Sequence, residues 1–397
     1  MKTSNVWFKA LDTIFGYLLL PLGFVAFLVR KAKNSEQDFI PSKLLVVKLC
    51  CLGDSILSLI ALISLRAKYP YARIAVLCSR RNNWIYERSG LVDEVIVFPI
   101  SGLSGWRELY SLPIVLRQFI YLFKQKDEVV IDFDIYYRFT TLLSMFPGRK
   151  VVAGYISPRG IDRTLFYDHR TKRDNNLPEW QNFFKLLEPF KLEISNNAIT
   201  LTSSPIESNL ADKMILAIKH KGKVLIAVVP GSSENWPEKR WSPHAFAAAM
   251  RLLAKEIDAV FVIIGTKEEF PVTDQMVKMF NDENRVVNLA GKTTPGVLIS
   301  LMSKINGMIS NDTGPMHLAA LMGVPVVGLF GPTNERKWSP PAKKFIAITS
   351  ACSKRPCDQI SRLPNCSGSD CMSSIQPEMV ATALIELLNS VGLKGNE

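Results

Sequence analysis

Two series of short apolar runs, separated by amphipathic stretches, constrain the fold of this 397-residue chain more than any other feature of its sequence. This alternation is typical of βαβ units in a parallel sheet. The runs of the first series cover 43–49, 73–79, 94–98 and 128–133, and those of the second cover 224–231, 259–265, 305–312 and 324–331. The sequence therefore predicts an α/β protein with two Rossmann-like domains facing a central cleft, where ligands meet the carboxyl ends of both sheets.

Turn and capping signals set the expected helices and domain boundaries. Asp54 is placed to cap a helix that Tyr69-Pro70 ends. The expected helices cover 54–68, 81–89, 106–123 and a segment after 242–243. A polar stretch over about 188–222 is interpreted as the interdomain linker. The predicted divisions are a hydrophobic N-terminal segment (1–40), two Rossmann-like domains (41–200 and 201–375) and a C-terminal helix (376–397).

The N-terminal segment is more hydrophobic than the rest of the chain. The run IFGYLLLPLGFVAFLV (14–29) carries no charge, but it is shorter than the roughly 20 residues of a spanning helix and contains Pro21. Arg30, Lys31 and Lys33 follow it in place of a cleavage site, as in a flank that faces lipid headgroups. We expect residues 6–33 to attach the protein to a membrane surface, either inserted or lying in the interface. A hydrophobic helix packed on the protein is the alternative.

Charge and cysteine content narrow the partners and the compartment. The formal net charge of +12 favours acidic partners, but no basic arm, zinc-finger spacing or RNA-binding aromatic pattern supports nucleic acid. Seven cysteines, an odd number, argue against a fully paired secreted framework and favour a reducing cytoplasm. Four of them crowd one loop without Cys-x2-Cys pairs, so a metal site, disulfides and free thiols all stay open there. These are Cys352, Cys357, Cys366 and Cys371.

The segment NDTGPMHLAALMGVPVVGLFGPT (311–333) places a polar turn between a strand and a helix. Asp312 or Thr313 can cap that helix, Gly314 permits close approach of a ligand, and His317 falls in the first turn. The helix amides and dipole then form a site suited to phosphate. The competing interpretation is a plain helix cap with a packed histidine.

Two further strand ends carry polar residues in the same half of the chain. The loop PGSSENWPEKRW (230–241) offers the hydroxyls of Ser232 and Ser233 and the cation of Lys239 to a diphosphate, although a Lys-Arg pair is also common on solvated surfaces. Gly265 and Glu268 follow another strand and can meet a nucleoside, which is a weaker signal.

In the first half, Asp54 stands at the start of a helix after the first strand, with Lys48 nearby on that strand. A carboxylate there can accept a proton from an acceptor hydroxyl. A simple helix cap is the alternative for Asp54, and a solvated or structural cation is the alternative for Lys48.

These pieces, in this order, resemble the heptosyltransferase family, glycosyltransferase family 9, over about residues 43–390. The stretches that carry the resemblance are LLVVKLCCLGDSILSLIALISLRAKYPYARIAVL, PGSSENWPEKRWSPHAFA, NDTGPMHLAALMGVPVVGLFGPT and CMSSIQPEMV. The resemblance implies a GT-B fold whose first domain binds the acceptor and whose second binds the nucleotide-sugar donor. It also implies inverting sugar transfer that needs no metal or other cofactor, typically from ADP-heptose to a lipopolysaccharide-core or related lipid-linked or oligosaccharide acceptor.

The resemblance assigns roles to individual residues. Asp54 is the implied general base. The implied donor-site residues are Ser232, Ser233, Lys239, Gly265, Glu268, Asp312, Thr313, Gly314 and His317. With the N-terminal segment, the expected location is the cytoplasmic face of the bacterial inner membrane. A catalytically silent nucleotide-sugar-binding scaffold and a protein O-glycosyltransferase are the alternative functions.

Overall fold

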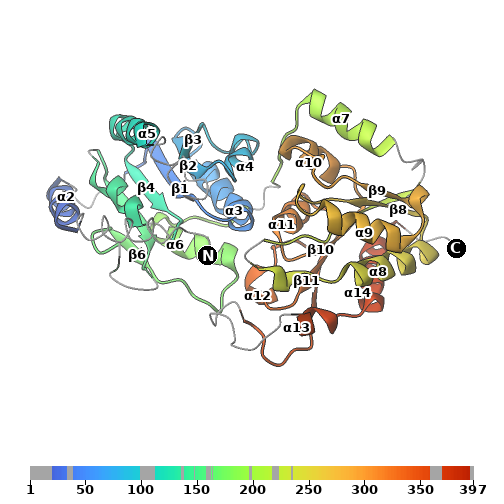
Figure 1. Ribbon diagram of the computed structural model, residues 1–397. Coiled ribbons are helices and arrows are strands. Elements are labelled where there is room, and N and C mark those ends of the chain that lie inside the picture. Colours follow the sequence, from blue (N-terminus) through green and yellow to red (C-terminus); the bar gives the residue numbers. More distant parts are fainter. Residues whose placement is uncertain are drawn as a thin grey trace. The chain divides into compact units, whose positions relative to one another are not determined.

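The computed structural model divides the chain into two compact units, Met1–Ile199 and Thr200–Glu397, and each is described by itself. Figure 1 shows the ribbon of both. The structure describes residues 20–33, 39–98, 112–135, 138–146, 148–157, 162, 164–195, 199–216, 223–233, 236–357 and 369–393.

The first unit is built on a six-stranded sheet in the order β3-β2-β1-β4-β5-β6, and all its strand pairs are parallel. Its strands are β1 (Lys43–Lys48), β2 (Arg73–Ser79), β3 (Glu94–Phe98), β4 (Val129–Asp132), β5 (Val151–Tyr155) and β6 (His169–Thr171). Its helices are α2 (Leu20–Lys33), α3 (Leu52–Lys68), α4 (Asn83–Glu87), α5 (Leu112–Gln125) and α6 (Glu179–Leu187), with the 3-10 segments η2 (Arg138–Met145) and η3 (Glu188–Phe190). The four predicted strands of this half are confirmed.

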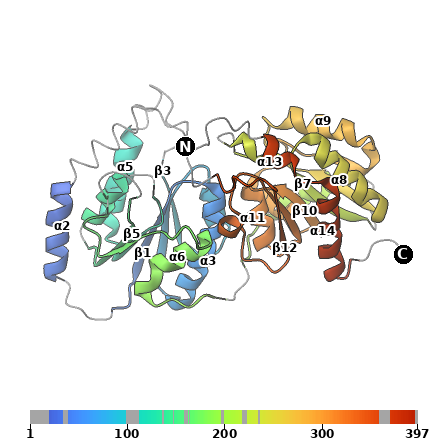
Figure 2. The same cartoon turned by 90° about the horizontal axis from the view of Figure 1, so that it is seen from below.

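The second unit repeats this plan, with the strand order β12-β11-β10-β7-β8-β9 and all pairs parallel. Its strands are β7 (Val224–Val229), β8 (Ala259–Ile263), β9 (Val286–Asn288), β10 (Gly307–Asn311), β11 (Val326–Phe330) and β12 (Phe345–Thr349). Its helices are α7 (Pro205–Leu216), α8 (Pro243–Glu256), α9 (Phe270–Phe280), α10 (Pro295–Met302), α11 (Gly314–Leu321), α12 (Glu335–Trp338), α13 (Ser369–Ser373) and α14 (Pro377–Ser390), with η4 (Pro237–Lys239) and η5 (Glu283–Arg285). Figure 2 shows α8 and α14 beside this sheet.

Each sheet has the doubly wound order: strands are added outward on one side of the first strand and then, after a reversal of strand order, on its other side. That reversal lies between β1 and β4 in the first unit and between β7 and β10 in the second. The residues of β1, β4, β7 and β10 are almost all buried, as parallel strands covered on both faces require. Ligands of such sheets bind at the carboxyl ends of the strands beside the reversal. The loops that follow β1, β4, β7 and β10 are therefore the candidates for ligand binding.

Two sequence interpretations need correction. The stretch 188–222 is not linker throughout, because α7 lies within it and packs against α10. A capping box begins α7: the backbone N–H of Ser204 donates to Glu207, and the N–H of Glu207 donates to the Ser204 hydroxyl. The helix predicted over 106–123 is described only from Leu112, so its earlier positions lie outside the described residues.

The hydrophobic N-terminal segment is described only from Leu20. Its described part forms α2, which packs against η2 of the first unit. In the described part of the chain, no helix combines the length and the apolar content that crossing a membrane requires.

Candidate functional site

The loop and the turn predicted to bind a donor flank the same point of the second sheet. The loop 230–241 follows β7, and the turn 312–314 follows β10, its neighbour at the reversal of strand order. Asn311 joins them: its side-chain amide donates to the Pro230 carbonyl at 2.8 Å, and its Oδ1 accepts from the backbone N–H of Trp241 at 3.2 Å. The sheet thus brings together residues that lie 81 positions apart in the chain.

A buried ion pair closes this arrangement. Lys239 Nζ lies 2.7 Å from Asp312 Oδ2, and His317 Nε2 lies 3.9 Å from Asp312 Oδ1. Burial alone would raise the pKa of Asp312, but Lys239, His317 and the Thr333 hydroxyl outweigh it, so the pKa is lowered from its usual value. Asp312 is therefore an anion at neutral pH, and Lys239 is fixed at the end of β10.

The remaining residues of the loop have distinct surroundings. The hydroxyl of Ser232 donates to the Trp236 carbonyl at 2.9 Å and accepts from Arg240 Nε at 3.2 Å, so Ser232 holds the loop in shape. Ser233 is exposed. Trp241, 2% exposed, anchors the end of the loop through its indole N–H, which donates to the Ile375 carbonyl.

At the start of α11, a residue predicted to cap the helix lies at the N-cap position but does not make the expected side-chain hydrogen bond. Thr313 occupies the N-cap position, yet its side chain makes no capping hydrogen bond. Gly314 and Pro315 form the first helical positions, where the amides have no intrahelical partner. His317, in the first turn, is 3% exposed.

The loop that follows β8 contains Glu269, a residue that the sequence analysis did not single out. Glu268 is exposed, whereas the neighbouring Glu269 accepts from the backbone N–H of Thr266 at 2.8 Å. The Glu269 carboxylate occupies the space beside Gly231, where a Cβ would lie only 2.0 Å from its Oε1, and it also lies beside Gly265. These two glycines follow β7 and β8, and side chains at either would displace Glu269.

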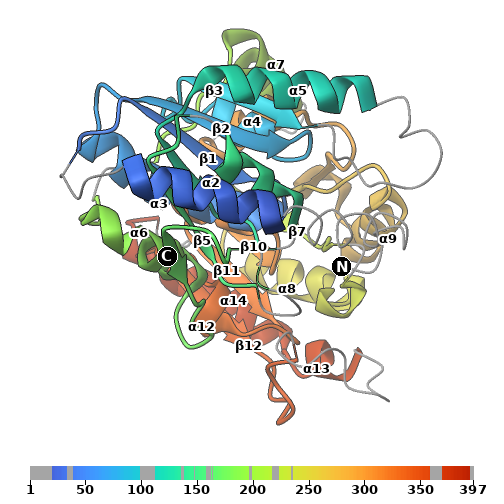
Figure 3. The ribbon, with the colours of Figure 1, turned by 90° about the vertical axis from the view of Figure 1, so that its left-hand side faces the viewer.

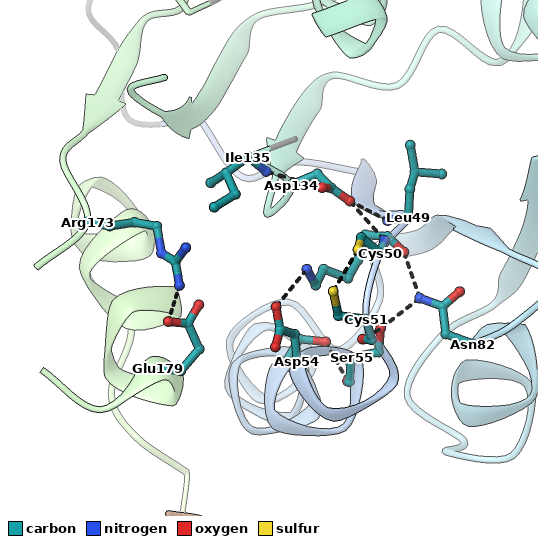
Figure 4. Close-up of polar contacts among 12 residues, drawn as sticks. Leu49, Cys50, Cys51, Asp54, Ser55, Asn82, Asp134, Ile135, Arg173 and Glu179 are labelled. Carbon is teal, nitrogen blue, oxygen red and sulfur yellow. Dashed lines mark hydrogen bonds and ion pairs between the residues drawn. The ribbon is translucent and has the colours of Figure 1, made fainter. Parts of the chain in front are cut away.

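In the first unit, Asp54 lies in the first turn of α3 and not at its cap, so that prediction is wrong. The helix already begins at Leu52, with Cys51 at the N-cap in a left-handed conformation (φ 67°) and no side-chain cap. Lys48 Nζ lies 3.4 Å from Asp54 Oδ2, and Figure 4 shows Asp54 close to Cys51 and Ser55. Because Asp54 is not the cap residue of α3, its carboxylate is not used in helix capping.

Lys48 is a structural partner and not a solvated cation. It is 2% exposed, and burial alone would lower its pKa, but Asp54 and Asp134 outweigh burial and raise the pKa well above its usual value. Asp134, after β4, accepts from the backbone N–H groups of Leu49 and Cys50 at 2.6 and 3.1 Å. Asp54, Lys48 and Asp134 thus gather at the reversal between β1 and β4.

Three further residues of the first unit belong to this group, and no motif in the sequence signals them. Arg173 and Glu179 form an ion pair (Figure 4). The charge of Asp54 contributes to a raised pKa at Arg173, after the larger effects of burial, which lowers it, and of Glu179. Tyr155, 1% exposed at the end of β5, has a pKa raised by burial and by Glu179, and its hydroxyl has no hydrogen-bond partner among the described residues.

Six of the seven cysteines fall in two groups. Cys50 and Cys51 lie beside Asp54, with their sulfur atoms 2.6 Å apart. The hydrogen bond between the two thiols, burial and the nearby Asp54 raise the pKa of Cys51. Of the four late cysteines, Cys366 lies outside the described residues, so the set is not tested as a whole. Within the described ranges, no three His, Cys, Asp or Glu side chains are grouped to hold a metal ion.

Comparison with known proteins identifies the family. The model of glycosyltransferase family 9 (heptosyltransferase) matches residues 133–366, which is more than half of the chain. The chain belongs to glycosyltransferase family 9.

Curated relatives agree with this assignment. A lipooligosaccharide heptosyltransferase 2 of Campylobacter jejuni is 28% identical over 55% of this chain and 61% of its own length. A protein of the same name from Haemophilus influenzae is 33% identical over 31% of this chain and 36% of its own length. The chain thus spans less than two thirds of these two relatives. A lipopolysaccharide core heptosyltransferase of Haemophilus influenzae is 22% identical over 76% of this chain and 82% of its own length.

Solved structures share the fold. A family 9 glycosyl transferase from Veillonella parvula has a TM-score of 0.73 and 23% identity, covering 90% of this chain and all of that one. The ADP-heptose heptosyltransferase II of Escherichia coli has a TM-score of 0.69 and 21% identity, covering 88% and 99%. Both place the two parallel sheets of this chain within the fold of heptosyltransferases.

Proposed function

We propose that this protein is an inverting glycosyltransferase that moves a sugar from a nucleotide diphosphate donor to a hydroxyl of the lipopolysaccharide core or a related glycan. The observation that carries the proposal is Asp54, released from helix capping and held by Lys48 at the reversal of the first sheet. A carboxylate in this position can accept the proton of an acceptor hydroxyl as its oxygen attacks the anomeric carbon.

The second unit supplies the chemistry of the leaving group in this proposal. In the proposal, Lys239, which pairs with Asp312, and the first amides of α11 stabilise the departing diphosphate. Because a fixed cation and oriented amides already offset the developing charge, we propose that transfer proceeds without a metal. ADP-heptose is the proposed donor, since one structural neighbour, an Escherichia coli heptosyltransferase, has been solved with ADP-2-deoxy-2-fluoro heptose.

The location is also a proposal. The hydrophobic segment, of which α2 is the described part, and the net charge of +12 favour action at the cytoplasmic face of a bacterial inner membrane, where lipid-linked acceptors lie.

The proposed independence of metal can be tested with EDTA. Purified protein treated with EDTA should retain its rate of transfer, because no step of the proposed reaction uses a divalent cation.

The test of the general base is Asp54→Asn, an isosteric change that removes the negative charge. We expect the variant to bind ADP in calorimetry with the affinity of the wild type and to lose at least about a hundredfold in kcat for transfer, the lower range for a general base. Asp93→Asn is the matched control, because Asp93 ends a loop of the same unit and pairs with Arg66. Wild-type transfer by the Asp54 variant would refute the assignment, and a wild type that binds ADP without turnover would favour a binding scaffold.

A further inference from the structure

The helix α2 exposes large apolar side chains and buries an arginine, which is the reverse of the usual arrangement in water. Its inward face presents Gly23, Phe27 and Arg30 to the first unit, with Gly23 and Arg30 buried. Five large apolar side chains of the helix are between 48% and 60% exposed: Leu22, Phe24, Val25, Leu28 and Val29. Of these, the Phe24 ring also lies 5.6 Å from the Phe166 ring. A helix in water normally buries such residues and exposes its arginine.

Several contacts fix this orientation. Arg30 Nε lies 2.8 Å from Asp168 Oδ2, and the guanidinium donates to the carbonyls of Ser144 at 3.0 Å and Phe166 at 2.6 Å. A Cβ on Gly23 would come within 2.9 Å of the Phe166 ring, so only glycine allows this close approach. Rotating α2 to bury its apolar side chains would break the Arg30 contacts, so the outward apolar face is built into the unit.

The helix α5 presents a second outward stripe of the same kind. Leu116, Ile120 and Phe123 are exposed at helical spacing, while Leu122 is fully buried and Phe119 packs edge-on against Phe98. Ile114 and Tyr121 are also exposed but lie farther round the helix, and the Tyr121 hydroxyl donates to Glu94.

Both stripes lie on one side of the first unit. Figure 3 shows α2 and α5 running in similar directions on the side that faces the viewer, and Figures 1 and 2 place both at the same margin of this unit. Contacts with η2 and the next residue join the two helices. The segment η2 contacts α2, and Phe146, which follows η2, packs edge-on against Phe119 and Phe123 of α5. We call the exposed apolar residues of these two helices the α2–α5 face. It holds 10 of the 20 exposed large apolar side chains in the described part of the chain.

Charge indicates what covers this face. Neither helix contains an acidic residue, whereas exposed cations accompany the apolar side chains. These are Lys31, Arg117, Lys124 and the neighbouring Lys126. Apolar side chains with flanking cations are the pattern of helices that lie in the interface of an anionic bilayer.

We propose that the α2–α5 face docks on an anionic lipid bilayer, with both helices lying along the boundary between headgroups and acyl chains. Because Arg30 binds α2 to the folded unit, α2 lies on the membrane and does not cross it. The inference rests on the proposed location at a membrane surface, but not on the proposed transfer reaction. It adds α5 as a second contact, which holds the first unit in one orientation on the lipid.

Vesicle flotation of the full chain tests the proposal. The probes are vesicles of phosphatidylcholine alone and of phosphatidylcholine mixed with phosphatidylglycerol. The variant Leu116→Glu/Ile120→Glu places two anions on α5, and both positions are exposed (59% and 48%), so the fold should tolerate it. The matched control is Ile206→Glu/Leu216→Glu on α7 of the second unit, at apolar positions that are 80% and 68% exposed.

We expect the wild type and the α7 control to float with the anionic vesicles, and the α5 variant to bind them at least about tenfold more weakly. Added salt should reduce wild-type binding, because it screens the attraction of the cations to the headgroups. Undiminished binding of the α5 variant, or an equal loss in the α7 control, would overturn the proposal. A wild-type dimer that the α5 variant dissociates, with no vesicle binding in either, would overturn it in favour of a second copy of the chain.

Calorimetry with ADP separates this result from the proposed function. All three proteins should bind ADP alike, because neither pair of substitutions changes a residue of the loop 230–241 or of the turn 312–314. Failure of the wild type to bind ADP would count against the donor site and leave the vesicle result unaffected.

Discussion

The ion pair between Lys239 and Asp312 gives the sharpest prediction, because it joins the two donor motifs through buried charges. The side chain of Lys239 is 17% exposed and that of Asp312 is 5% exposed, and their charged atoms lie 2.7 Å apart. The substitution Lys239→Met keeps most of the length and packing of the side chain but removes its charge. The carboxylate of Asp312 then remains buried beside His317, without its nearest cation.

The magnitude follows from this burial. Removing one partner of a buried pair costs about 3–5 kcal/mol, and partial exposure of Lys239 places the expected loss in unfolding free energy at the lower end, about 3 kcal/mol. The double variant Lys239→Met/Asp312→Asn should recover most of that loss, because it leaves no unpaired charge. ADP affinity should fall in both variants, since both lack the ammonium proposed to bind the diphosphate.

The pH dependence has a definite sign. The pKa of Asp312 is lower in the folded protein than in the unfolded chain, where an aspartate titrates near about 3.9. The wild-type stabilisation is therefore fully present above that value and is lost as the pH falls through the lower folded pKa. In Lys239→Met the pKa of Asp312 should rise, so the deficit of the variant should be largest at neutral pH and shrink in acid.

Urea unfolding at neutral and acidic pH measures these differences, with hydrogen exchange of peptides from the second unit as the readout. This readout is needed because a chain of two units need not unfold in one step. Equal stability of Lys239→Met and the wild type, within about 0.5 kcal/mol, would show that the ion pair does not stabilise the second unit. A double variant as unstable as the single one would show that the unpaired charge of Asp312 is not the cause of the loss.

Three other changes test particular contacts. Tyr155→Phe should raise the unfolding free energy by about 1 kcal/mol in urea unfolding, because it removes a buried hydroxyl that has no partner in the described structure; a loss of stability would contradict that unpaired state. Arg30→Met should speed hydrogen exchange of residues 20–33 about tenfold or more, since it leaves Asp168 without its cation, and unaltered exchange would contradict the anchoring role. Gly231→Ala should weaken ADP binding by displacing Glu269, and adding Glu269→Ala should restore it; calorimetry that finds no rescue would argue for a different cause.

Much of the fold was predictable because its signals are local. The apolar runs of the eight predicted strands have the length and burial of parallel strands, and Ser242 caps α8 as its sequence suggests. The strands β5, β6, β9 and β12 were missed, because their short or mixed runs resemble loops until a neighbouring strand pairs with them. The helix α7 was missed although its capping box was readable at Ser204 and Glu207.

The candidate site divides in the same way. The residues that follow the central strands could be read from the sequence, because apolar periodicity marks where a strand ends and polar turn residues begin. The sequence therefore indicated Asp54, Lys239 and Asp312. It also placed the cationic and apolar residues that make the N-terminal segment unusual.

How these residues act on one another depends on contacts that the folded chain makes between distant segments. Lys239 and Asp312 are 73 positions apart, and their pairing depends on the strand order that makes β7 and β10 neighbours. The burial of Arg30 against Asp168, and with it the outward turn of the apolar side chains of α2, likewise depends on contacts across more than a hundred positions. Sequence periodicity carries no information on such pairs, because charge and burial are set by the three-dimensional neighbours of a side chain and not by its neighbours in the chain.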